Sequence, residues 1–211
     1  MAYIIALDVN SSFSSQITQA VYILKKGGIV AYPTETIYGL ACDSLNEKAV
    51  EKIFIVKGRN ERMPIPIIVS DESQLSLMVK TIPPGARKLA GRFWPGGVTI
   101  VFEASSVVPV SLTGGTGKIG IRISSNPVAS LLARQLGSPI TATSANRSGR
   151  PECITAAEVN ESIGGRIDAI IDGGRTPGPP GTTVVDATVS PPLVLREGKI
   201  SGKLILKAFT E

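Results

Sequence analysis

The feature that most constrains the fold is the alternation of helical segments with short apolar strand segments along the chain. Phe13, Ile17, Val21 and Leu24 recur at helical spacing, two glycines end this helix, and a short buried strand is predicted directly after them. The same change of period recurs along the sequence. It predicts helices over 13–24, 46–57, 87–93, 126–136 and from 155 onwards, and strands over 29–32, 65–69, 98–102, 119–123, 139–143, 167–171, 183–185 and 193–195.

Start signals support several of these elements. Asn46 is placed to cap the second helix, and Asn126 followed by Pro127 is typical of a helix N-terminus. Thr155 and Glu158 have the spacing of a capping box. Because helices and strands alternate, with additional strands late in the chain, we predict an α/β (α+β) fold with one large, open, twisted mixed sheet and flanking helices. The length of 211 residues predicts a single domain over 1–211.

Composition excludes several kinds of catalytic site. The chain has no histidine, which excludes the usual proton shuttle at neutral pH, a Ser-His-Asp triad and a Cys/His zinc site. The 22 Lys and Arg against 17 Asp and Glu give a net charge of +5, which permits an anionic partner without requiring one. We therefore expect the chemistry to depend on positioning and on neutralisation of charge.

Other signals bear on the cellular location. Cys42 and Cys153 form no CxxC pair, and residues 1–10 have no basic segment of the kind that begins a signal peptide. The longest apolar run is far shorter than a membrane span. We therefore expect a cytoplasmic protein with reduced thiols and no membrane association.

One glycine-rich segment does not carry the function that its letters suggest. Residues 115–120 spell GxGxxG, but a dinucleotide fingerprint follows a strand and opens a helix, whereas this segment precedes a predicted strand. A P-loop would require glycine at position 112 and Ser or Thr at 119, where the chain has Leu112 and Ile119. Neither motif is therefore assigned.

Three places combine polar side chains with strand or helix ends. Residues 32–36 (YPTET) put two hydroxyls and a carboxylate at the end of a strand, where they either hold a polar ligand, as strand ends of open α/β sheets do, or form an ordinary turn with local hydroxyl bonds. Lys57 and Arg59 end a helix, where cations either interact with the helix dipole or hold phosphate or carbonate oxygens. Residues 144–146 (SAN) either form an ordinary turn or offer donors to an anion. Two arginines near or on predicted strands lie either on a solvated face or in a cleft: Arg122 and Arg196.

Together, these segments and their order resemble the YrdC family over roughly 13–201, which is nearly the whole chain. The resemblance is carried by 32–40 (YPTETIYGL), 57–59 (KGR), 93–96 (FWPG), 121–123 (IRI), 144–149 (SANRSG), 182–186 (TTVVD) and 195–198 (LREG). It implies an open α/β domain with a large, concave, basic cleft. It also implies a single-domain threonylcarbamoyl-AMP synthase, a nucleotidyltransferase that joins L-threonine, bicarbonate and ATP and releases pyrophosphate.

The resemblance also implies roles for individual residues. Lys57 and Arg59 would be catalytic and would hold the nucleotide phosphates and the carbonate-derived group. The substrate-binding residues would be Thr36, Arg122 (on the substrate carboxylate), Ala142, Ser144 and Thr182. The nucleotide-binding residues would be Lys57, Arg59, Ser144, Asn146 and Arg196.

The family also implies the cofactor and the partners. Mg²⁺ would enter with ATP, and no protein side chain is expected to bind a metal. The product would pass to tRNA-modification proteins that use the adenylate to make threonylcarbamoyladenosine. Weak binding of double-stranded RNA or tRNA is a further expectation.

Two departures from the family pattern leave alternatives open. Many family members have a lysine or asparagine after the basic pair and then a strand with a histidine, whereas this chain has Met63 at the first of these positions and no histidine near Ile68. Residues 178–183 (GPPGTT) resemble YciO-type paralogues, although the chain keeps the Lys-x-Arg and Ser-x-Asn patterns that those paralogues usually lack. The alternatives to the synthase are therefore a YciO-type paralogue, or an RNA-binding module of the same fold without synthase activity.

Overall fold

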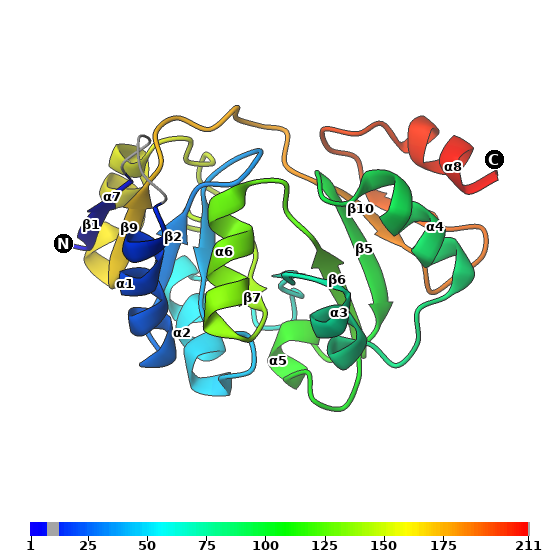
Figure 1. Ribbon diagram of the computed structural model, residues 1–211, viewed down its shortest axis with the longest axis horizontal. Coiled ribbons are helices and arrows are strands. Elements are labelled where there is room, and N and C mark those ends of the chain that lie inside the picture. Colours follow the sequence, from blue (N-terminus) through cyan, green and yellow to red (C-terminus); the bar gives the residue numbers. More distant parts are fainter. Residues whose placement is uncertain (8–12, 211) are drawn as a thin grey trace.

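The computed structural model describes residues 1–7 and 13–210, and the strands of this part form two mixed sheets side by side (Figure 1). The first sheet has the strand order β1 (Tyr3–Ala6), β9 (Ala169–Asp172), β2 (Val30–Tyr32), β3 (Gly39–Ala41) and β8 (Thr143–Ser144). The second sheet has the strand order β11 (Leu193–Arg196), β10 (Thr183–Asp186), β5 (Val98–Glu103), β6 (Lys118–Arg122), β4 (Ile67–Ile68) and β7 (Ile140–Thr141).

Both sheets contain parallel and antiparallel pairs. In the first sheet β1, β9 and β2 are parallel, whereas β3 is antiparallel to both β2 and β8. In the second sheet β10 is parallel to β5 and β6 is parallel to β4, and the other pairs are antiparallel. The predicted mixed α/β class is therefore confirmed.

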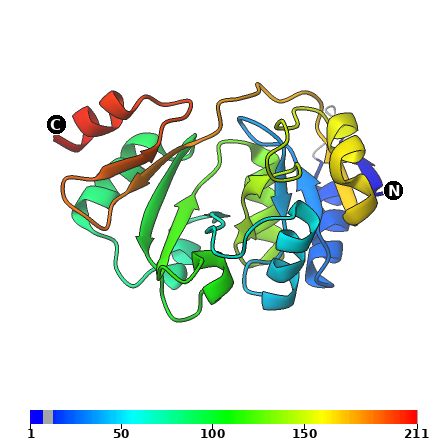
Figure 2. The same cartoon turned by 180° about the vertical axis from the view of Figure 1, so that it is seen from behind.

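Helices cover both faces of the first sheet and one face of the second (Figures 1 and 2). Helices α1 and α6 pack together on one face of the first sheet, with α2 and α7 on the other face. Helices α4 and α8 contact each other on the covered face of the second sheet. The helices are α1 (Ser14–Lys25), α2 (Glu47–Lys57), α3 (Glu72–Met78), α4 (Pro84–Phe93), α5 (Val110–Thr113), α6 (Pro127–Leu136), α7 (Ala156–Ile163) and α8 (Gly202–Thr210), with a 3₁₀ turn at Gly164–Arg166.

The other face of the second sheet is left open as the wall of a groove. Along β5, Val98, Ile100 and Phe102 point into the hydrophobic core, whereas Thr99 and Val101 alternate to the opposite face and line the groove. The alternation along β5 thus directs one set of side chains into the core and the other set, Thr99 and Val101, to the groove.

The predicted helix start signals are present in the structure. Asn46, Asn126 and Thr155 each accept a hydrogen bond from a backbone N–H of the first helical turn, at 3.2, 2.9 and 3.2 Å. The second half of the expected capping box differs, because Glu158 accepts the N–H of Ile154 at 2.7 Å. The sequence analysis missed β1, β3, α3, α5 and α8. Of residues 1–10, Tyr3–Ala6 forms β1, and 8–10 lie outside the described part.

The prediction of one large sheet is wrong, because residues 140–144, the crossing segment, change partners midway. Its first two residues form β7 and pair with β4, whereas its last two form β8 and pair with β3. Between them, Ala142 donates its N–H to Pro66 at 2.8 Å. The sequence predicts a single strand over 139–143, since an apolar pattern does not specify which neighbour a strand pairs with.

Thr141 holds the crossing segment against β3 and is fully buried. Its hydroxyl donates to the carbonyl of Leu40 at 2.8 Å and accepts the N–H of Cys42 at 2.9 Å. Its own carbonyl accepts the Tyr32 hydroxyl at 3.0 Å. One side chain therefore satisfies two backbone groups where the sheets meet.

We expect Thr141→Val to lower the free energy of unfolding by about 1–3 kcal/mol, because a valine of the same shape leaves both backbone groups without this partner. Urea denaturation measures the change. Thr18→Val, at an exposed position of α1, is the control and should change stability by less than about 0.5 kcal/mol. Equal effects of the two substitutions would contradict the role of Thr141.

Candidate functional site

A cavity lies where the two sheets meet, beside the crossing segment. It is lined from the loop after β2, from the crossing segment and from the second sheet by Thr36, Ala142, Ser144, Thr99, Arg122, Thr182 and Arg196, and from the end of α2 by Arg59. Because these residues come from distant parts of the chain, the cavity depends on the correct placement of both sheets.

The described residues on the cavity wall include three guanidinium groups and one carboxylate, that of Glu152, so the charge of the wall is positive. Arg59 follows Gly58, whose φ of +58° ends α2, and it donates to the carbonyl of Pro64 at 3.0 Å. Arg196 donates to the carbonyl of Thr182 at 2.8 Å. Burial and then the nearby charge of Arg196 lower the pKa of Arg59. The arrangement suits a ligand with several anionic oxygens, which guanidinium groups bind in bidentate fashion.

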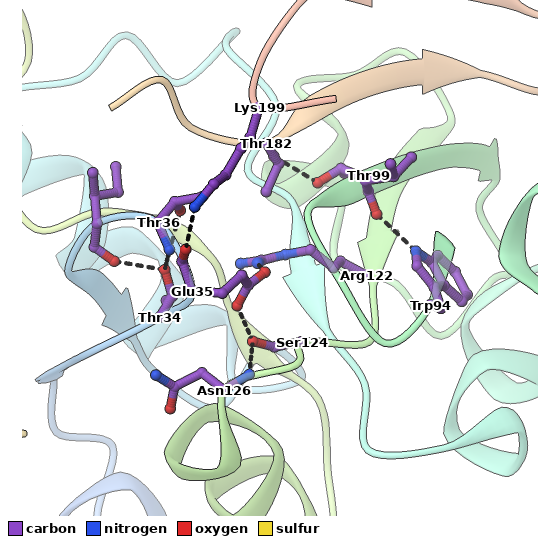
Figure 3. Close-up of polar contacts among 12 residues, drawn as sticks. Thr34, Glu35, Thr36, Trp94, Thr99, Arg122, Ser124, Asn126, Thr182 and Lys199 are labelled. Carbon is purple, nitrogen blue, oxygen red and sulfur yellow. Dashed lines mark hydrogen bonds and ion pairs between the residues drawn. The ribbon is translucent and has the colours of Figure 1, made fainter. Parts of the chain in front are cut away.

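Arg122 is the most buried of the three cations, with 5% of its surface exposed. Burial lowers the pKa of its guanidinium to about 10, and the charge of Arg196 acts in the same direction. Arg122 forms an ion pair with Glu35, and the carboxylate of Glu35 also accepts the hydroxyl of Ser124 (Figure 3). The sequence left open whether Arg122 lies on a solvated face or in a cleft, and the structure places it on the cavity wall.

Lys57 lies behind the cavity wall, and the described residues that line the cavity do not include it. It is 2% exposed, and its ammonium donates to the carbonyls of Ser144 and Asn146, the latter at 2.7 Å. The Asn146 side-chain oxygen is a third acceptor at 3.4 Å. These contacts use all the donors of the ammonium, so Lys57 holds the 144–146 turn. Burial, then the charge of Arg59, lowers its pKa to about 8.

Asn146 is likewise committed within the protein. It is 4% exposed, and its side-chain amide donates to the carbonyl of Arg150. The backbone of the same loop bonds to α2, because Ser148 donates to the carbonyl of Lys57 at 2.9 Å. This loop is therefore a rigid support for Ser144, which does line the cavity.

The structure brings together most of the residues that the resemblance implied. Those on the cavity wall are Thr36, Arg59, Arg122, Ala142, Ser144, Thr182 and Arg196, whereas Lys57 and Asn146 lie behind it. Their catalytic and binding roles stay predictions. The sequence analysis missed Thr99, whose hydroxyl bonds to that of Thr182 at 2.9 Å (Figure 3). The sequence signal for Thr99 is a polar residue between two apolar residues of a predicted strand, because alternate residues of a strand point to opposite faces.

Two kinds of feature are absent from the part of the chain that is described, a cluster of metal ligands and a helix that could span a membrane. Within residues 1–7 and 13–210, no three His, Cys, Asp or Glu side chains gather as metal ligands would. No helix of the same part has both the length and the apolar character to cross a bilayer. Both cysteines are free and buried.

The fold and the site define an α/β protein with an arginine- and hydroxyl-lined cavity between two mixed sheets. The family model Sua5/YciO/YrdC, described as telomere recombination, matches residues 22–198. The chain belongs to this family, which confirms the resemblance noted in the sequence.

Individual relatives agree with this assignment. Threonylcarbamoyl-AMP synthase of Pyrococcus abyssi is 42% identical over 188 residues, which are 89% of this chain and 55% of the relative. The enzyme of the same name from Coxiella burnetii is 34% identical over 83% of this chain and 94% of the relative. The chain spans less than two thirds of the P. abyssi relative, and 59% of a Bacillus subtilis relative of the same name.

Solved structures also resemble this chain. P. abyssi Sua5 complexed with L-threonine superimposes with a TM-score of 0.92 at 38% identity, over 99% of this chain and 60% of that one. Escherichia coli YciO has a TM-score of 0.85 at 30% identity and is covered over 98% of its own length. The two-sheet architecture is therefore shared with both branches of the family.

The buried ammonium of Lys57 predicts a pH-dependent stability. The pKa of an unfolded lysine is 10.5, whereas the pKa of folded Lys57 is about 8. Between these two values, unfolding takes up a proton, and a rise in pH therefore favours the folded state. We expect the stability of the wild type relative to Lys57→Met to increase by about 1 kcal/mol per pH unit in this interval.

Urea denaturation at pH 7.5 and pH 10 tests this expectation. The matched control is Lys48→Met, on the exposed side of the same helix, whose difference from the wild type should stay constant with pH. A constant difference for Lys57→Met as well would show that Lys57 is accessible to water in solution.

Proposed function

We propose that this chain is an L-threonylcarbamoyladenylate synthase, a nucleotidyltransferase that condenses L-threonine, bicarbonate and ATP and releases pyrophosphate. The observation that carries the proposal is the cavity in which Arg59, Arg122 and Arg196 meet the hydroxyls of Thr36 and Thr182. It is supported by the names of the relatives and by the L-threonine complex of P. abyssi Sua5.

The arrangement suits the chemistry of this reaction. The amine of threonine and bicarbonate form an N-carboxylate and water, and the N-carboxylate then attacks the α-phosphorus of ATP as pyrophosphate leaves. Both reactants are anionic, so Arg59 and Arg196 would reduce their repulsion and stabilise the leaving group. ATP would enter as its Mg²⁺ complex, in which the ion neutralises part of the triphosphate charge. No protein nucleophile is needed, which agrees with the lack of histidine.

The other residues have supporting roles in this proposal. Ser144 and Thr182 would contact the nucleotide and threonine, and Lys57 and Asn146 would act by holding the turn that carries Ser144. Arg122 would bind the threonine carboxylate. The product would pass to tRNA-modification proteins in the cytoplasm.

A second candidate is a YciO-type activity on the same ligands. The observation in its favour is the match to E. coli YciO over 98% of that chain, together with the GPPGTT loop at 178–183. Such a protein would use the same cavity without condensing the three substrates.

The deciding experiment measures pyrophosphate release from Mg²⁺–ATP by the purified protein, with threonine or bicarbonate omitted in turn. The synthase releases pyrophosphate in a way that requires both. Binding of ATP and threonine without release would favour the YciO-type alternative.

We expect Arg59→Ala to lower the rate of pyrophosphate release ~100-fold or more, because a preorganised cation at the triphosphate is lost. Circular dichroism verifies that the variant is folded. Arg87→Gln, which breaks an exposed ion pair with Glu72 on the outside of the second sheet, is the control and should keep full activity. An unchanged rate of pyrophosphate release by Arg59→Ala would show that Arg59 does not stabilise the triphosphate.

A further inference from the structure

The loop after β11 fixes the backbone of Thr182, which lies on the cavity wall directly before β10. Arg196 donates to the main-chain carbonyl of Thr182 through Nε at 3.2 Å and through Nη2 at 2.8 Å. Gly198 packs so closely on this carbonyl that a Cβ at position 198 would overlap it. A side chain there would displace one of the two segments, so the glycine allows the loop to hold Thr182 in one position.

The residue after Thr182 connects this loop to β5. Thr183 is fully buried, and its N–H donates to the carbonyl of Gly97 at 3.1 Å. Its hydroxyl accepts the N–H of Gly198 at 3.0 Å. Because β10 and β5 are paired, with Thr183 opposite Val98, the backbone brings Thr182 beside Thr99.

The hydroxyl of Thr182 has two partners within the protein. The hydroxyl of Thr99 lies 2.9 Å away, and Nη2 of Arg196 donates to the same oxygen at 3.2 Å (Figure 3). A hydroxyl has one proton and two lone pairs, and a guanidinium can only donate. Arg196 therefore fills one lone pair of Thr182, and the bond to Thr99 uses either the second lone pair or the proton.

An anionic ligand selects one direction of the bond between the two threonines. Thr99 is 2% exposed, and its hydroxyl has no other hydrogen-bond partner within the residues that the structure describes. If Thr99 donates to Thr182, both lone pairs of Thr182 are filled and its proton is left for the cavity. Anionic oxygens accept and do not donate, so they favour this arrangement. The two bonds that Thr182 accepts also polarise its hydroxyl and make it a stronger donor.

The two threonines lie where the cavity meets the groove on the open face of the second sheet. Thr99 and Arg196 line both the cavity and the groove, whereas Thr182 lines the cavity alone. In the proposed reaction the amino acid and the nucleotide are joined through the N-carboxylate. One of its oxygens forms the bond to the α-phosphorus, and the other does not react.

We propose that Thr99 is a positioning residue, which directs the hydroxyl proton of Thr182 to the non-attacking oxygen of the N-carboxylate. This inference rests on the proposed function. The other carboxylate oxygen bonds to the α-phosphorus as the bond from phosphorus to pyrophosphate breaks, and the hydroxyl proton stays on Thr182. Because the donor is fixed before the substrate binds, it orients the attacking oxygen without reorganisation of the protein.

Steady-state kinetics of pyrophosphate release by Thr99→Val tests the proposal, because valine keeps the branched shape of threonine and cannot donate. We expect kcat to fall ~10-fold, the effect of one hydrogen bond. The KM values for threonine and Mg²⁺–ATP should stay within about twofold, because the bond orients the reacting group and not the bound substrates. Thr99→Ser keeps the hydroxyl and should restore kcat. Thr18→Val, at an exposed position of α1, is the matched control and should have the kinetics of the wild type.

A double variant tests whether Thr99 acts through Thr182. Thr182→Val removes the donor, so nothing is left for Thr99 to position. The kcat of Thr99→Val combined with Thr182→Val should therefore equal that of Thr182→Val within about twofold, and losses that multiply would overturn the proposal. If a valine variant does not fold, Thr99→Ser should be ~10-fold faster than Thr99→Ala, and equal rates of these two would overturn it.

The rate of the wild type separates this inference from the proposed function. A wild-type protein that releases no pyrophosphate would overturn both. Release by the wild type, together with an unchanged kcat of Thr99→Val, would overturn this inference alone. A rise in the KM for threonine or Mg²⁺–ATP at unchanged kcat would also overturn it, because the donor would then serve a bound substrate and not the group that joins the two.

Discussion

The two sheets are joined through the buried hydroxyl of Thr141, and the cavity depends on that junction. The hydroxyl bonds to the backbone of Leu40 in β3 of the first sheet and of Cys42 just after β3, while the backbone of Thr141 belongs to β7 of the second sheet. One residue later, at Ala142, the chain passes from one sheet to the other and lines the cavity. Since an unpaired buried backbone group costs free energy, the relative position of the two walls depends on these hydrogen bonds between distant segments of the chain.

Lys57 and Arg59 are two residues apart, yet Lys57 holds a turn of the protein whereas Arg59 lines the cavity. Lys57 ends α2 facing inward and gives its donors to the 144–146 turn. Gly58 then takes a left-handed conformation, with φ +58°, which turns the chain so that Arg59 reaches the cavity. An ammonium can satisfy three converging carbonyl-type oxygens, whereas the planar guanidinium of Arg59 keeps donors available for a ligand.

Local structure and much of the cavity wall could be predicted from the sequence. Asn46, Asn126 and Thr155 cap their helices because capping depends on neighbouring residues, and the motifs around Thr36, Arg122 and Thr182 converge as the family resemblance implied. The partner change at Ala142 and the burial of Lys57 could not be predicted, because they depend on segments more than 70 residues away in the chain. For the same reason the carboxylate at Glu35 was seen but its pairing with Arg122 was not.

The charge distribution divides the cavity into two parts that match the proposed substrates. Arg59 and Arg196 line both the cavity and the adjoining groove on the open face of the second sheet, so an extended anion such as a nucleotide triphosphate can reach both. Arg122 lines the cavity without the groove, and Glu35 compensates its charge. A cavity with arginines alone would bind the triphosphate in either part. A compensated arginine in one part would leave that part nearly neutral, which suits the amino acid of the proposed reaction.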